Sequence, residues 1–71
     1  MTEEYRYFKR EYDSGVEFCM YRSSDGYERW LRYDGTWANF RKWDYTVLDY
    51  TKNNPEEWTE LTEEEMFLEM L

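Results

Sequence analysis

Histidine is absent from this sequence, and cysteine occurs once, as Cys19. A zinc site built from cysteine and histidine therefore lacks ligands, and an intramolecular disulfide lacks a second thiol. Catalytic and metal triads that depend on histidine are excluded in the same way. The sequence predicts no catalytic residue, no cofactor and no metal, and we expect Cys19 to be a small core or half-buried residue.

Glycine, proline and long apolar runs are also scarce. The three glycines, at positions 15, 26 and 35, each follow Ser or Asp and predict turns, not a phosphate-binding loop. No apolar run approaches the length of a membrane span, and the N-terminus is acidic, so neither a span nor a signal peptide is expected. With a single cysteine, which suits a reducing compartment, the pattern predicts a cytoplasmic protein.

Aromatic residues are abundant, at 23% of the 71 residues, and isoleucine is absent. A domain of this size buries only about 60–65% of the surface that its unfolded chain exposes. Without a disulfide or a metal, its core must be stabilised by packing. We expect aromatic side chains to form most of that core. Those left exposed would be interface anchors, and the candidates are Trp30, Trp37, Trp43 and Tyr33.

Residues 4–42 predict an antiparallel β-meander of three to four strands. Val16, Phe18 and Met20 alternate with Glu17, Cys19 and Tyr21, which is the period of a strand with one face inward. Asp-Gly pairs at 25–26 and 34–35 supply the positive φ of tight turns. The expected strands cover residues 5–10, 16–21, 27–33 and 36–42. Bulky residues on both sides of the third strand imply either a sheet covered on both faces or one open aromatic face.

The segment 43–52 has two interpretations. Trp43, Val47 and Tyr50 suit a short helix capped by Asp44, whereas residues 45–47 suit a strand, and we favour the helix. Pro55, after two asparagines, ends that element, and a short extended piece is expected at 57–61.

A C-terminal helix is predicted over residues 62–71. Thr62 and Glu65 have the spacing of a capping box, and Leu61 and Met66 that of a hydrophobic staple. The helix is expected to pack on the sheet through the face formed by Met66, Phe67, Met70 and Leu71. The predicted fold is therefore a single α+β domain, residues 1–71, with a capped helix on an antiparallel sheet.

Three short segments carry a resemblance. Residues 27–30 (YERW), 34–37 (DGTW) and 61–65 (LTEEE) resemble features of small uncharacterised bacterial and phage single-domain proteins with an aromatic meander and a capped terminal helix. The resemblance spans roughly residues 15–71. It implies the fold described above and no activity.

The net charge of −8 lies entirely in the C-terminal part of the chain. Residues 1–42 carry eight basic and eight acidic side chains, whereas residues 43–71 carry one basic and nine acidic ones. Such a run is either a solvated face or a surface that steers a basic partner. The candidate partner-binding carboxylates are Glu56, Glu57, Glu60, Glu63, Glu64 and Glu65.

These features predict a non-enzymatic, acidic protein-binding domain that modulates or inhibits a larger partner. A sharper version is a phage-type inhibitor whose glutamate face mimics nucleic acid and blocks a nucleic-acid-binding or defence protein. One alternative is a housekeeping oligomerisation module, including a homodimer, that docks through exposed aromatics. Another is a single-stranded nucleic-acid binder with arginines among stacking aromatics, which the acidic C-terminal part disfavours.

Overall fold

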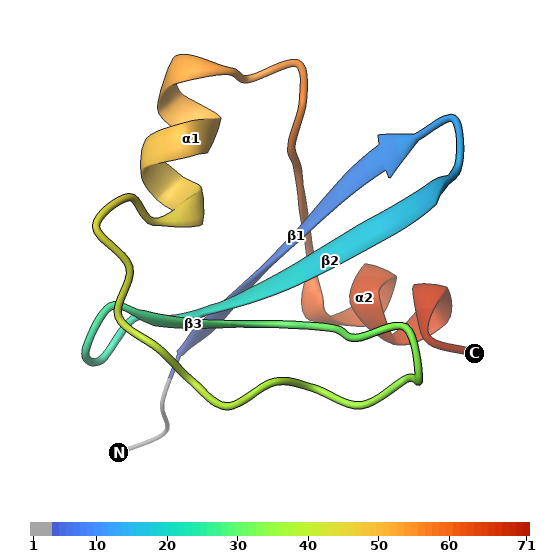
Figure 1. The fold of residues 1–71 in the computed structure, drawn as a ribbon, viewed down its shortest axis with the longest axis horizontal. Coiled ribbons are helices and arrows are strands. Elements are labelled where there is room, and N and C mark those ends of the chain that lie inside the picture. The colour runs from blue at the N-terminus through green and yellow to red at the C-terminus, as the bar shows by residue number, and fades with distance from the viewer. Residues whose placement is uncertain (1–3) are drawn as a thin grey trace.

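The protein folds as a four-stranded antiparallel sheet with two helices, in a computed structural model that describes residues 4–71 (Figure 1). The strands are β1 (Tyr5–Tyr12), β2 (Gly15–Arg22), β3 (Tyr27–Trp30) and β4 (Thr59–Leu61), and the helices are α1 (Val47–Asn53) and α2 (Glu63–Glu69). The strand order is β3-β2-β1-β4. The predicted α+β class, with a meander and a C-terminal helix, is confirmed.

The register of β1 and β2 separates the side chains into two faces. Phe8 lies opposite Cys19, and Tyr7 lies opposite Met20. Because neighbouring side chains on a strand point to opposite faces, these two pairs belong to different sides of the sheet. Cys19 also pairs with Trp30 of β3, which continues the first face across the sheet.

Each face is covered by a different helix. On the first face, Phe8 and Cys19 form a buried cluster with Val47 of α1 and with Trp58. On the second face, Phe18 and Leu61 form a buried cluster with Met66 of α2. Of the two possibilities that the sequence leaves open, the structure therefore has a sheet covered on both faces. The first face, beneath α1, carries the site described below.

The predicted strand at 36–42 was wrong. This segment pairs with β3 only in part: Leu31 bridges Trp37, Glu28 bridges Arg41, and the Ala38 N–H donates to the Trp30 carbonyl. The two bridges differ in register by one residue, as at a β-bulge, and this interrupts the ladder along β3. The fourth strand is instead the extended piece expected near 57–61, and it pairs with β1.

The helix boundaries also differ from the expectation. The N-cap of α1 is Thr46, not Asp44, and a capping box links Thr46 to Asp49. Thr46 and Asp49 thus form the same kind of capping box that identified the second helix. The predicted box of Thr62 and Glu65 is confirmed, although α2 ends at Glu69.

The predicted packing face of the C-terminal helix was mostly wrong. Met66 is buried, but Phe67, Leu68, Met70 and Leu71 are exposed. The helix ends at Glu69, so Met70 and Leu71 lie beyond it, and only Met66 and Phe67 of the predicted face fall within α2. The other apolar side chains remain at the surface.

Cys19 is fully buried between the sheet and α1, as expected for a structural cysteine. Burial raises the pKa of its thiol, and the neighbouring Glu28 raises it further. Neither helix found within residues 4–71 is long and apolar enough to cross a membrane.

Candidate functional site

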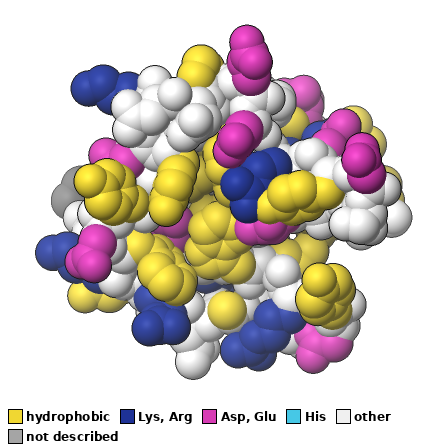
Figure 2. Space-filling model, turned by 45° about the horizontal axis from the view of Figure 1, so that its top comes forward, with side chains coloured by type: hydrophobic (Ala, Val, Ile, Leu, Met, Phe, Trp, Pro, Cys, Tyr) yellow, Lys and Arg dark blue, Asp and Glu magenta, His cyan; other side chains and the backbone are white. Residues whose placement is uncertain are grey.

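A groove of about 550 Å³ opens on the face of the sheet that α1 covers. Its lining comes from all three meander strands, from the segment before α1, from α1 itself and from the residue that precedes β4. Five of the eight lining residues are aromatic: Trp30, Trp43, Tyr45, Tyr50 and Trp58. Figure 2 shows hydrophobic side chains gathered around the middle of one face of the molecule, with acidic and basic groups around them.

The floor of the groove is held by two tryptophans. Trp58 is only 3% exposed, and its ring meets that of Trp30 edge to face, with 5.3 Å between the centroids. The indole nitrogen of Trp58 is sealed from solvent and has no hydrogen-bond partner among residues 4–71. Because this nitrogen is inaccessible, Trp58 contributes shape and apolar contact to the groove and no polar recognition.

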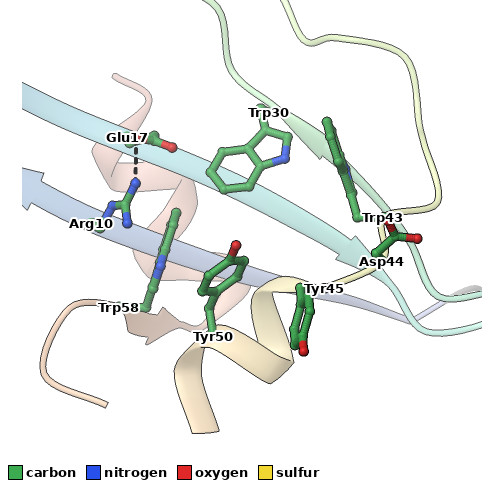
Figure 3. Close-up of a pocket in the computed structure, with 8 residues that line it drawn as sticks. All are labelled: Arg10, Glu17, Trp30, Trp43, Asp44, Tyr45, Tyr50 and Trp58. Atoms are coloured by element: carbon green, nitrogen blue, oxygen red, sulfur yellow. Dashed lines mark hydrogen bonds and ion pairs between the residues drawn. The ribbon is translucent and has the colours of Figure 1, made fainter. Parts of the chain in front are cut away.

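The walls are more open than the floor. Trp43 is 38% exposed, Tyr45 65% and Tyr50 48%. Figure 3 shows Trp58 and Trp43 on opposite sides of the cavity, with Trp30 and Tyr50 facing each other between them. The Tyr50 hydroxyl points across the groove, whereas the Tyr45 hydroxyl points away from it. Such half-exposed aromatic rings are the side chains that interfaces use as anchors.

Charged side chains line the groove at two places. The Arg10 guanidinium lies 4.6 Å from the centre of the Trp58 ring and pairs with Glu17 at 3.3 Å and with Glu57 at 3.6 Å. This cation is therefore already matched. Asp44, beside Trp43, makes no hydrogen bond or ion pair with any of residues 4–71. Its carboxylate leaves the rim of the groove acidic.

A buried carboxylate fixes α1 to the sheet and so positions Tyr50. Glu28 of β3 is 1% exposed. One of its oxygens accepts a hydrogen bond from the backbone N–H of Val47, the first residue of α1, and the other accepts from the Cys19 thiol at 3.4 Å. Burial raises the pKa of Glu28 above its usual value, and these two hydrogen bonds offset part of that rise.

This raised pKa predicts a pH dependence of stability. The folded state binds the Glu28 proton more tightly than the unfolded state does. The stabilisation of the fold by this proton is therefore fully present below the ordinary glutamate pKa. That contribution is lost as the pH rises through the folded value. We expect the unfolding free energy of the wild type, relative to Glu28→Gln, to fall by about 1.4 kcal/mol for each pH unit between the two pKa values.

Urea unfolding of both proteins between pH 4 and pH 8 measures this difference. The subtraction removes the opposite contributions of Glu60, Glu65 and Asp49, whose pKa values are lowered by Arg6, Thr62 and Thr46 respectively. If the difference in unfolding free energy between the two proteins stays constant or rises with pH, burial is not the dominant influence on the pKa of Glu28.

The predicted acidic residues do not form one free surface. Glu60 pairs with Arg6 at 2.6 Å, Glu65 accepts from the Thr62 amide at 3.0 Å, and Glu57 faces Arg10. Glu56, Glu63 and Glu64 are exposed and make no hydrogen bond or ion pair within residues 4–71. Only these three remain wholly available to a partner.

The predicted aromatic residues are also divided. Trp30 and Trp43 line the groove together. Trp37 packs on the opposite face against the cluster that contains Met66, and Tyr33 lies fully exposed in the turn after β3. The sequence did not single out Tyr45, Tyr50 and Trp58 as site residues. The helical spacing of Trp43 and Tyr50, together with a tryptophan directly before a strand, was the available signal.

The arginines of the sheet lie over aromatic rings of the same chain. Arg29 is 5.1 Å from the centre of the Trp37 ring and 4.7 Å from that of Phe40, and Arg41 is 4.8 Å from that of Trp43. These contacts occupy ring faces and guanidinium groups that a single-strand binder would offer to bases and phosphates. The geometry therefore gives the nucleic-acid alternative little support.

Comparisons with protein families, with curated proteins and with solved structures find no match to this chain. The resemblance to small bacterial and phage proteins stays a prediction. Interpretation of the site rests on its own geometry.

Proposed function

We propose that this chain is a non-enzymatic protein-binding domain that modulates a larger partner, and that the aromatic groove is its principal contact surface. The observation that supports the proposal is the exposure of Trp43, Tyr45 and Tyr50 around one concavity. Large aromatic side chains that are half exposed and held on a rigid frame lose little conformational entropy on binding. They are the usual centres of protein interfaces.

The charge of the groove favours a basic partner. Its outer wall, at residues 43–50, belongs to the part of the chain that carries the whole net charge of −8. The carboxylate of Asp44 lies at its rim without a partner in residues 4–71. A one-signed surface raises the rate of association with an oppositely charged protein, and salt weakens this effect.

Affinity capture tests whether the groove is the contact surface. The tagged wild type and the double variant Trp43→Ala/Tyr50→Ala are incubated with lysate of the source organism and washed with low and then high salt. We expect a partner that the wild type retains and the double variant loses, because two anchors are removed while the buried core is unchanged. Circular dichroism confirms that the variant is folded. If both proteins retain the same set, the groove is not the contact surface.

A second candidate is inhibition of a nucleic-acid-binding or defence protein through α2. Glu63 and Glu64 are exposed without internal partners, and Phe67, Leu68 and Leu71 form apolar surface beside them. A helix with acidic and apolar side chains fits a basic, partly apolar groove. Glu63→Lys/Glu64→Lys tests this candidate in the same capture. Glu65 is left unchanged because its carboxylate caps α2.

A homodimer or other oligomerisation module is less well supported. Trp30 and Trp37, the tryptophans that such a module would use, pack against the two buried clusters. Alanine at either position is therefore expected to destabilise the fold before it tests association. Like charge on two copies would also oppose self-association.

A further inference from the structure

The hydrogen-bonding groups of the groove identify a class of ligand. Trp30, Trp43 and Tyr50 carry polar groups that make no hydrogen bond within residues 4–71. The indole nitrogens of Trp30 and Trp43 are donors only, and the Tyr50 hydroxyl also donates. The Trp30 nitrogen is not among the sealed polar atoms, and the Tyr50 hydroxyl points into the cavity (Figure 3).

Acceptors are scarcer in the groove. Among residues 4–71, the carboxylates on its lining are Glu17 and Asp44. Glu17 already accepts from Arg10 at 3.3 Å and from the Tyr12 hydroxyl at 2.6 Å. Asp44 lies at the rim. Among the side chains at the centre of the groove, flat apolar rings with N–H and O–H groups therefore predominate, and the one unpaired carboxylate lies at the rim.

A proline-rich segment has the complementary chemistry. Proline has no backbone N–H, so a run of prolines presents carbonyl acceptors and apolar rings. Its polyproline II conformation is already formed before binding, which lowers the entropic cost, and aromatic-lined grooves are known to bind such segments. An ordinary extended peptide would instead bury N–H donors against a surface with few acceptors, which is unfavourable.

We propose that the aromatic groove binds a proline-rich segment of a protein partner in the polyproline II conformation, with a basic residue of that segment placed against Asp44. This inference rests on the proposed function and names the partner chemistry of the same groove. The volume of about 550 Å³ suits a few residues of such a segment. The segment comes from another protein, since this chain contains a single proline.

The orientation of the basic residue follows from the charges. At the inner side of the groove, Glu17 is already paired with Arg10, whereas the carboxylate of Asp44 has no partner within residues 4–71 and attracts a cation. The net charge of −8 acts in the same direction at longer range. A basic flank should therefore strengthen binding and an acidic flank should weaken it.

The test is a titration of the ¹⁵N-labelled full chain, followed through the indole N–H signals of its four tryptophans. The probe is a decaproline peptide with an arginine at each end. The matched control peptide has alternate prolines replaced by alanine at equal length and charge. A third peptide carries glutamate in place of both arginines.

We expect saturable shifts of the Trp30 and Trp43 signals with the proline probe, and roughly tenfold or greater weakening with the alanine control. The Trp37 signal, on the opposite face of the sheet, serves as an internal reference and should not move. The glutamate peptide should bind more weakly than the arginine peptide. Tyr50→Phe, which removes only a hydroxyl, should weaken the proline probe while leaving the fold intact.

Equal binding of the proline and alanine peptides, or no saturable shift at Trp30 and Trp43, overturns the proposal. If the glutamate peptide binds more tightly than the arginine peptide, the proposed contact between a basic residue and Asp44 is rejected. If the lysate capture still shows a partner that depends on Trp43 and Tyr50, protein binding by the groove stands and only the proline-rich ligand is rejected. The failures of the two proposals are thus distinguishable.

Discussion

Replacing Glu28 with alanine is expected to lower the free energy of unfolding by about 2–4 kcal/mol. The change removes the acceptor of the Val47 amide and leaves that buried N–H without a partner. It also leaves a void beside Phe8, Cys19 and Val47, all of which are at most 1% exposed. Relief of a buried charge acts in the opposite direction, but an orphaned donor combined with a cavity outweighs it.

Such a loss is large for a chain of 71 residues, because small domains have unfolding free energies near the lower end of the usual 5–15 kcal/mol. Urea unfolding at pH 7 measures the change. Glu28→Gln is the matched control, since its amide oxygen still accepts from Val47 and its volume is unchanged. We expect it to retain most of the stability. Equal loss in both variants would mean that the carboxylate itself, and not the acceptor geometry, holds α1.

Trp58→Ala is expected to cost about 3–5 kcal/mol, the usual range for truncating a buried large aromatic. Trp58 is 3% exposed and contacts both Trp30 and the Arg10 guanidinium. Its removal opens the core beneath the groove and leaves Arg10 without its stacking partner. Trp43→Ala, at a residue 38% exposed, is expected to cost only about 1 kcal/mol, chiefly through the lost contact with Arg41.

Thermal and urea unfolding of the two alanine variants compares them directly. Trp58→Phe refines the test, because phenylalanine keeps an aromatic ring and removes the indole nitrogen that has no hydrogen-bond partner in residues 4–71. We expect this variant to be much more stable than Trp58→Ala. Similar losses at positions 43 and 58 would contradict the division of the groove into a structural floor and an exposed wall.

The two Asp-Gly turns and the cap of α2 were predictable because their signals are local. Gly26 and Gly35 adopt φ of 77° and 85° after aspartate, as the turn chemistry requires. Thr62 and Glu65 complete their box within a single turn of helix. In each case the residues that decide the conformation are neighbours in the sequence.

The errors occurred where distant contacts decide the outcome. The segment 36–42 has strand-like composition, but its bridges to Glu28 and Leu31 are one residue out of register with each other, and the ladder is broken. Glu28 appears in the sequence as an ordinary polar strand residue, and its burial depends on the amide of Val47, nineteen positions away. Neither interaction can be inferred from composition or periodicity.

The candidate site was predictable only in part for the same reason. Trp30 and Trp43 were expected among the exposed aromatics, but their meeting with Tyr50 and Trp58 depends on where α1 and the segments on either side of it pack. Six carboxylates were predicted as a partner-binding face, and internal partners take up Glu60, Glu65 and Glu57. Charge counted along the chain therefore overestimates the charge available to a partner.

The groove, and not the surface of α2, is the proposed contact with the protein partner. The most direct test is the dissociation constant of the captured partner for the wild type, for Trp43→Ala and for Glu63→Lys/Glu64→Lys, measured by isothermal titration calorimetry. The account predicts roughly tenfold or greater weakening for Trp43→Ala, as for an interface anchor, and a much smaller change for the α2 variant. Unchanged affinity of Trp43→Ala, with binding lost in the α2 variant, would contradict it.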